Sequence, residues 1–419
     1  MIARNNSQGP YASRRRGELG EVIFRPVGSA GAISGRSDSA APSRAANSVG
    51  ESSNDGDRSI VLGRGDIDEP IPRIDPAHWR VTRTPTTFDS ASPALAEETL
   101  GSSRRFEVFR QYGNFTMAYA TLQPGMKYFE SHGGYLAYDT CGGVNFVLGD
   151  PVAPAEDYAA IIEAFVRMHP RTCFCQVSKP VGAILARLGW FVNEFGADMD
   201  LDLPTYDFEG PKKSKFRQAA HKIEREGYTI EERTVADGDG IQLDALSSSW
   251  LAAKTVKQEA RFLVRPLAFG DEPEVRKFDL RDSDGSVVAF VAFDPICEKG
   301  EVIGYSPAIK RRAPDAPTGA EEAITKFAIE RFRAEGFRTF RLGLLPLCDV
   351  QDSEFREARL LKKVFQLAYR YGDRWIFSFR GHADFKHRYR GNLSKVYFAT
   401  YTRLNAWNLV SLLRLCRLH

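Results

Sequence analysis

The spacing of hydrophobic residues changes near Phe106. Before it, residues 1–104 are rich in Ser, Gly, Ala, Arg and Pro and show little hydrophobic periodicity. A segment of this kind buries too little apolar surface to offset its ordering entropy, so we predict a mostly disordered N-terminal region. From there to the C-terminus, short strand-like and helix-like patterns alternate, which predicts a folded region.

The folded region divides into two halves, 105–210 and 211–402, with a similar order of elements. In the first half we expect strands at 115–122, 134–139, 145–149, 172–177, 190–195 and 197–203, and helices at 158–168 and 181–188. In the second half we expect helices at 212–226, 241–257, 321–335 and 356–371, and strands at 228–234, 278–280, 287–293, 301–305, 339–344 and 395–401. Antiparallel strands with packed helices in both halves predict an α+β fold with two related lobes. Residues 403–419 predict an amphipathic C-terminal helix, which either packs on the folded body or lies on a membrane surface.

Composition narrows the class of protein. The 419 residues carry a nearly balanced formal charge of +3, so global charge argues for no particular partner. Six dispersed cysteines without a Cys-x-x-Cys pair predict reduced thiols rather than a disulfide framework or a zinc site. The first 16 residues lack an apolar core segment, and no apolar run approaches the roughly 18 residues that span a bilayer. We therefore expect a cytoplasmic protein, with contact to the inner face of the membrane left open.

The segment 305–320 is the most informative candidate site. It combines the basic triplet Lys310, Arg311 and Arg312 with a proline-rich turn and Gly319 at the entrance of a predicted helix. A helix entrance presents unpaired backbone N–H groups and the positive end of the helix dipole. The pattern predicts an anion-binding site.

Two further segments are strongly basic. Lys212, Lys213 and Lys215 stand before or in the first turn of a helix, where cations oppose the helix dipole, so phosphate contacts and a solvated helix face are about equally favoured. Between 356 and 395, cations that include Lys386 and Arg388 alternate with aromatic residues. This mixture suits nucleic acid or phospholipid headgroups, while a core of aromatics with cations outside is the alternative.

Glu259 lies near Trp250 in a third segment with several cations. As a structural residue it is an ion-pair partner worth about 0.2–0.5 kcal/mol, which is the favoured interpretation. As a functional residue it would recognise an ammonium group. The seven histidines do not pair with other metal ligands at the spacing of a metal site, so we predict no metal. The sequence also lacks a nucleophile elbow and the glycine-rich loops that bind nucleotides.

Six short motifs occur in an order that resembles the C-terminal catalytic domain family of phosphatidylglycerol lysyltransferases, over roughly residues 105–400. They are Leu148-Gly-Asp-Pro-Val152, Lys215-Phe-Arg-Gln-Ala219 through Gly227, Ser249-Trp-Leu251 with Glu259 and Phe262, Pro314-Asp-Ala-Pro-Thr-Gly319, Leu342-Gly-Leu-Leu-Pro-Leu347 and Phe385-Lys386. The sequence departs from the family at Pro307-Ala-Ile-Lys310 and at Lys386-His-Arg-Tyr-Arg-Gly391.

The resemblance implies two tandem acetyltransferase-like (GNAT) lobes. It also implies transfer of an amino acid from aminoacyl-tRNA to a hydroxyl of phosphatidylglycerol, or of a related acceptor, without a metal or redox cofactor. Carried over, Arg312, Asp315 and Gly319 shape the active-site loop, and Asp315 helps to remove the acceptor proton. Glu259 meets the aminoacyl ammonium, and Lys386 and Arg388 contact phosphate.

Two other functions remain open from the sequence. One is an acyl-CoA-dependent N-acyltransferase of the same fold, although the loop 314–320 lacks the pattern that cradles the CoA pyrophosphate. The other is a non-catalytic protein that binds RNA or an anionic membrane through its basic face. Partners under the leading hypothesis are aminoacyl-tRNA and anionic phospholipid; the amino acid and the oligomeric state are open.

Overall fold

The structure is a computed structural model that describes residues 101–233, 240–254, 258–268, 272–374, 377–403 and 406–417. Residues 1–100 of the region predicted to be disordered lie outside the described residues. Helix α1 (Ser102–Tyr112) begins within the last residues of that region.

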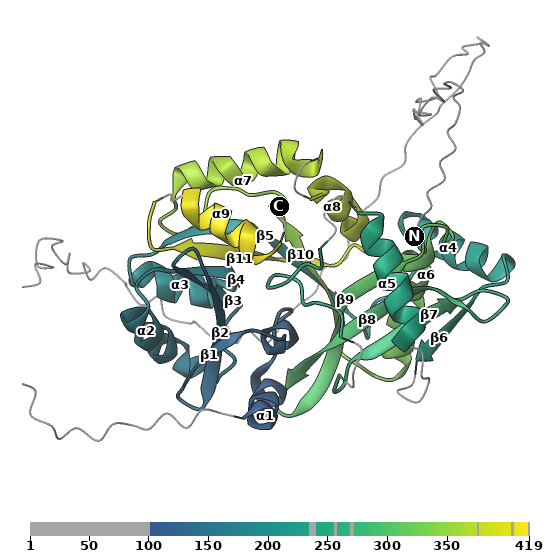
Figure 1. The fold of residues 1–419 in the computed structure, drawn as a ribbon, viewed down its shortest axis with the longest axis horizontal. Helices are drawn as coiled ribbons and strands as arrows, with labels where there is room; N and C mark the ends of the chain where they lie inside the picture. Colours follow the sequence, from purple (N-terminus) through teal and green to yellow (C-terminus); the bar gives the residue numbers. More distant parts are fainter. Residues whose placement is uncertain are drawn as a thin grey trace, which may run out of the picture. The chain divides into compact units, whose positions relative to one another are not determined.

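The described strands form one eleven-stranded sheet in the order β1-β2-β3-β4-β11-β5-β10-β9-β8-β7-β6 (Figure 1). Their bounds are β1 (Lys127–Ser131), β2 (Gly134–Cys141), β3 (Val144–Leu148), β4 (Thr172–Val177), β5 (Phe191–Asp202), β6 (Thr229–Arg233), β7 (Arg276–Arg281), β8 (Val287–Glu298), β9 (Glu301–Arg312), β10 (Thr339–Pro346) and β11 (Asn392–Thr400). The β3–β4 and β9–β10 pairings are parallel, and the other pairings are antiparallel.

The two halves of the sheet repeat one topology. In each half, three antiparallel strands lead through a crossover helix into a parallel strand: β1-β2-β3-α2-β4, with α2 at Tyr158–Met168, and β7-β8-β9-α6-β10, with α6 at Ala320–Ala334. A parallel pairing requires such a crossover. The α+β class with two related lobes, predicted from the sequence, is confirmed.

Helices cover both faces of the sheet because the strands are apolar on both sides. In the first half, α2 and α3 (Lys179–Arg187) share one core with the sheet, while α1, α7 (Arg359–Tyr371) and α9 (Ala406–Leu415) share the other. In the second half, α4 (Ser214–Arg225) and α6 pack on one face and α5 (Gly240–Ala252) on the other. Helix α8 (Phe379–His387) packs beside β10.

The two central strands tie the halves together. Strand β5 pairs with β10, and β11, which is far later in the sequence, inserts between β4 and β5. The sequence boundaries of the lobes, at 210 and 402, therefore stay a prediction, because strands from both sides of residue 210 alternate at the centre of the sheet.

Several predicted elements are corrected by the structure. The strand expected at 115–122 is wrong: these residues form a turn followed by the 3-10 helix η2 (Tyr119–Leu122). The strands expected at 190–195 and 197–203 are one strand, β5, bent at Gly196 with φ of +130°. The C-terminal helix packs on the folded body, with Leu412 and Leu415 buried. Among the described residues, no helix is long and apolar enough to cross a membrane.

Candidate active site

A cavity of about 770 Å³ lies where β5, β10 and β11 meet the segment 114–117. Carboxylates outnumber cations in its wall. The acidic lining residues are Asp150, Asp198, Asp200, Asp352 and Glu354, and the basic ones are Lys179, Arg341 and Lys395. An acidic wall of this kind favours a cationic or hydrogen-bond-donating substrate group.

Asp198 is the central acidic group of this cavity. It lies in β5, opposite Leu344 of β10 on one side and Ser394 of β11 on the other. Thr116 donates a hydrogen bond to Asp198 Oδ2, and Oδ1 is buried with no hydrogen-bond partner among the described residues. Burial raises the pKa of Asp198, and the Thr116 hydrogen bond and the nearby Lys386 and Arg341 oppose this shift. Asp198 thus contributes a carboxylate to the cavity wall, and one of its oxygens is buried without a hydrogen-bond partner among the described residues.

Lys386 lies beside Asp198 in the protein interior. Only 6% of it is exposed, and its Nζ donates to the carbonyl oxygen of Leu344 at 2.8 Å. Burial lowers the pKa of Lys386 to about 7; the charge of Lys310 lowers it further, and that of Asp198 opposes the shift. Close to neutral pH this side chain thus exchanges between its charged and neutral forms.

Arg341 holds the segment 114–117 against the cavity. Its Nη1 and Nη2 donate to the carbonyl oxygen and Oδ1 of Asn114, at 3.0 and 2.8 Å. This fork fixes the turn that carries Thr116, and with it the hydrogen bond to Asp198. The turn explains why the segment does not extend as the predicted strand.

Asp150 forms the other end of the cavity, in the Leu148-Gly-Asp-Pro motif. Its Oδ1 accepts a hydrogen bond from the backbone N–H of Ser178 at 2.8 Å, and burial raises its pKa to about 6. Gly149 has a φ of +70°, and a Cβ there would lie 2.6 Å from a ring carbon of Phe115. The glycine is therefore required by both backbone conformation and space.

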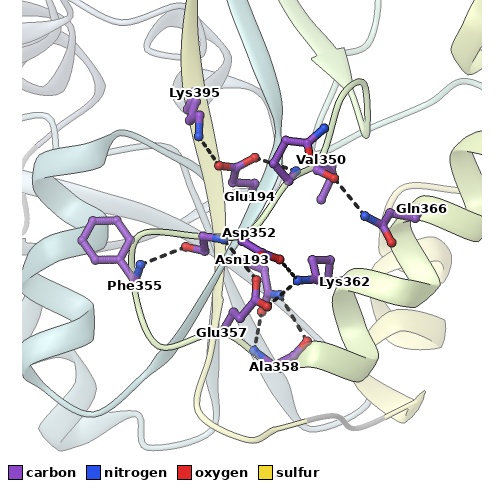
Figure 2. Close-up of polar contacts among 12 residues, drawn as sticks. Asn193, Glu194, Val350, Asp352, Phe355, Glu357, Ala358, Lys362, Gln366 and Lys395 are labelled. Atoms are coloured by element: carbon purple, nitrogen blue, oxygen red, sulfur yellow. Dashed lines mark hydrogen bonds and ion pairs between the residues drawn. The ribbon is translucent and has the colours of Figure 1, made fainter.

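The loop 347–358 after β10 supplies Asp352 and Glu354, and β5 and α7 hold it in place (Figure 2). Buried Asn193 exchanges two hydrogen bonds with the backbone of Ala358, at 3.0 and 3.2 Å. Glu194 accepts from the backbone N–H of Gln351 at 2.9 Å and from Lys395. On the helix side, Lys362 pairs with Asp352 and Glu357, and Gln366 donates to the carbonyl of Val350 at 3.0 Å.

The structure brings three of the predicted site residues together outside this cavity. Arg311 pairs with Glu259, lies 4.1 Å from the ring centroid of Trp250 and donates to Ser247 Oγ at 3.2 Å. Glu259 also accepts from the backbone N–H of Leu267 at 3.4 Å. This carboxylate is an ion-pair partner, which is the interpretation that the sequence favoured; its contact with an ammonium group stays a prediction.

The predicted anion site at the start of α6 is surrounded by carboxylates of the same helix. Glu321 lies 4.0 Å from Lys310 and 3.9 Å from Arg312, and Glu322 lies 3.4 Å from Arg388. Both glutamates stand in the first turn of α6, where negative charge is favoured by the helix dipole. Anion binding by this entrance stays a prediction.

Gly319 caps α6 in the left-handed region, with φ of +95°, and a Cβ there would lie 2.9 Å from Cβ of Ala219 in α4. This glycine allows close packing of two helices. The remaining predicted residues lie apart from the cavity: Lys212, Lys215 and Asp315 are exposed, and Lys213 pairs with Asp207 at 3.7 Å. Their roles stay predictions.

Sequence reasoning missed the residues that form the cavity. Asp198 and Asp200 alternate with apolar Ala197, Met199 and Leu201, a period of two that indicates a solvated strand face. The signal available in the sequence is the Leu148-Gly-Asp-Pro motif, which contains Asp150 of the cavity wall. No group of three or more potential metal ligands occurs in the part of the chain that the structure describes.

Comparison with known proteins identifies the family of the chain. The family described as "Phosphatidylglycerol lysyltransferase, C-terminal" matches residues 106–400. The chain belongs to this family. The match extends over β5, β10 and β11, the strands that meet at the cavity.

Similar proteins carry consistent names. A phosphatidylglycerol lysyltransferase of Bacillus subtilis (strain 168) is 26% identical over 264 residues, which are 60% of this chain and 29% of that protein. One of Staphylococcus epidermidis is 20% identical, over 69% of this chain and 34% of that protein. The chain thus spans about a third of the length of these curated relatives.

Two solved structures show the same fold. L-PGS from Bacillus licheniformis superposes with a TM-score of 0.63 at 22% identity, covering 75% of this chain and 96% of that one. The C-terminal domain of a putative lysylphosphatidylglycerol synthetase from Agrobacterium fabrum superposes with a TM-score of 0.60 at 21% identity, covering 74% and 94%.

Proposed function

We propose that this chain is an aminoacyltransferase that moves an amino acid from aminoacyl-tRNA to a hydroxyl of phosphatidylglycerol. The observation that carries the proposal is the family match over 106–400, together with the curated relatives named phosphatidylglycerol lysyltransferase. Lysine, the amino acid in those names, is the first donor to test.

The reaction exchanges one ester for another. The acceptor hydroxyl attacks the aminoacyl carbonyl, a new ester bond forms, the bond to the tRNA ribose oxygen breaks, and the hydroxyl proton passes to that leaving oxygen. The carbonyl is already activated and no electrons are lost or gained. Positioning and stabilisation of developing charge therefore supply the catalysis.

The acidic cavity suits the aminoacyl group of such a donor. In this proposal the carboxylate of Asp198, in the wall of the cavity, attracts the ammonium of the amino acid by its negative charge. Lys386 tunes Asp198 through its charge in this proposal, and its contact with phosphate stays a prediction. Asp315, exposed in the turn before α6, keeps its sequence-based role of helping to remove the acceptor proton.

The acyl-CoA alternative is disfavoured by the loop 314–320, which lacks the pattern that cradles the CoA pyrophosphate. We expect calorimetry to detect no tight binding of acetyl-CoA, and tight binding would favour this alternative.

The test measures radiolabel passing from charged tRNA into chloroform-extractable lipid. Label should enter lipid only when the chain and phosphatidylglycerol are both present. Deacylated tRNA with label in an aqueous product would exclude the lipid as the acceptor. Charged tRNA that stays intact would exclude aminoacyl-tRNA as the donor. Asp315→Ala should lower turnover with the fold intact. Near-normal activity of that variant would show that Asp315 does not help to remove the acceptor proton.

A further inference from the structure

Helix α7 is the lime helix at the top of Figure 1. Exposed apolar side chains form a stripe along it. Leu360 and Leu367 are each 57% exposed, and Tyr371 is 62% exposed. These positions are seven and four residues apart, so they fall on one side of an α-helix, with half-buried Val364 between them.

A neighbouring side of α7 already serves the fold. Leu361 and Phe365 are buried in the core that α7 shares with β5 and β11. Phe365 packs on Phe195 and Phe398 with ring centroids 5.5 and 5.9 Å apart. The exposed stripe is thus a second apolar surface that this core does not use.

A basic stripe runs beside the apolar one. Arg359, Lys363 and Arg370 are exposed and recur at helical spacing, and α7 contains no Asp or Glu. A helix with one apolar stripe flanked by Lys and Arg has the pattern of a helix that lies in a membrane interface. Aliphatic Leu side chains cannot stack on bases, so this surface suits a bilayer better than RNA.

A cavity of about 410 Å³ opens next to this stripe. It lies between α7, α8 and the start of the loop 347–358, and its wall includes Arg370 of the basic stripe and Arg380. Arg370 gives this wall a cation that suits an anionic headgroup, while Arg380 pairs with Asp373 at 2.8 Å and Asp349 adds one carboxylate to the wall. The same loop supplies Asp352 and Glu354 to the larger cavity, so one segment borders both.

We propose that the outer face of α7 docks the chain on an anionic phospholipid bilayer, with the neighbouring cavity facing the headgroups. The choice of a lipid partner rests on the proposed function. The docking surface itself rests on the exposed stripe, its flanking cations and the arginine-lined cavity.

Flotation of the full chain with vesicles tests the proposal. Vesicles of phosphatidylglycerol mixed with phosphatidylcholine should carry the chain upward, less so at high salt, and vesicles of phosphatidylcholine alone should not. The double variant Leu360→Gln/Leu367→Gln should bind anionic vesicles at least about tenfold more weakly, because two leucines no longer enter the bilayer. Lys363→Glu/Arg370→Glu should also lose binding.

The matched control is Val410→Gln on α9, which alters a side chain that is 40% exposed on a different helix. It should bind vesicles like the unmodified chain, and all variants should keep the same unfolding midpoint. Equal flotation of the Leu double variant, or no flotation of the unmodified chain, would overturn the proposal. The proposal would also be overturned if the Leu double variant floated normally but changed in oligomeric mass or in tRNA binding. The stripe would then belong to a contact with a second copy of the chain or with RNA.

Transfer assays separate this proposal from the proposed function. With phosphatidylglycerol in vesicles, the Leu double variant should transfer more slowly than the unmodified chain. With short-chain phosphatidylglycerol dispersed in solution, the two should be equal. If neither transfers label but only the unmodified chain floats, docking holds and the proposed function fails.

Discussion

At the scale of single residues, the pair Asp198 and Lys386 determines what the cavity can do. Lys386 is buried and Asp198 is half-buried, and the charge of each offsets part of the other's loss of hydration. The pair also shows the limit of the sequence. Lys386 was recognised as a candidate because it stands in a family motif, whereas its burial beside Asp198 depends on contacts between residues 188 positions apart, which periodicity cannot reveal.

Asp198→Asn should lower transfer about a hundredfold or more, because the amide carries no charge to bind the ammonium. Since burial raises the pKa of Asp198, transfer should also fall on acidification at a higher pH than an ordinary carboxyl group would give. The measurement is kcat/KM against pH. Asp200→Asn, a second acidic residue of the same wall, is the control and should have a smaller effect.

Lys386 should make stability rise with pH. Its pKa is lowered from 10.5 to about 7, so between these values the unfolded chain binds the proton and the folded chain does not. The free energy of unfolding therefore gains up to about 1.4 kcal/mol per pH unit in this window from this group. Chemical denaturation at pH 7 to 10 should show a smaller slope for Lys386→Met; an unchanged slope would show that Lys386 titrates normally.

At the scale of elements, the loop 347–358 is fixed by side chains of β5 and α7 rather than by its own sequence. Regular elements were predictable where periodicity is strong: α2 and β4 have the expected bounds, and α6 begins one residue earlier than expected. Helix α8 was missed because its nine residues include Gly381 and show no clear stripe. The loop was unpredictable because its partners, Asn193 and Glu194, lie in a strand far away in the sequence.

Asn193→Ala should destabilise the fold by about 2 kcal/mol, since it removes two hydrogen bonds and leaves the buried backbone N–H of Ala358 without its partner, while the carbonyl of Ala358 still accepts from the backbone N–H of Lys362. It should also lower transfer, because Asp352 and Glu354 move with the loop. Denaturant unfolding and the transfer assay measure both effects. Gln366 is exposed and makes one hydrogen bond to the loop. Gln366→Ala should therefore lower the free energy of unfolding by less than about 1 kcal/mol.

At the scale of the whole described region, the two halves are joined by their central strands. Sequence patterns predicted two lobes of related topology, which the sheet confirms. They did not predict that β11 inserts between β4 and β5, because strand order in a sheet depends on long-range pairing. The cavity lies at these strands, so the site belongs to both halves at once.

A fragment of residues 101–210 should not fold alone. Without β11, β4 and β5 lose their shared neighbour, and β5 also loses β10. The fragment should lack a cooperative unfolding transition, while residues 101–419 should show one. A stable, cooperatively unfolding fragment would mean that the first half is an independent domain.

The most direct test of the account is the initial rate at which labelled lysine passes from lysyl-tRNA to phosphatidylglycerol, for the unmodified chain and for Asp198→Asn. We expect labelled lipid with the unmodified chain and about a hundredfold less with the variant, at equal stability. Equal rates would place the reaction outside this cavity. Absence of labelled lipid with every charged tRNA would contradict the proposed function itself.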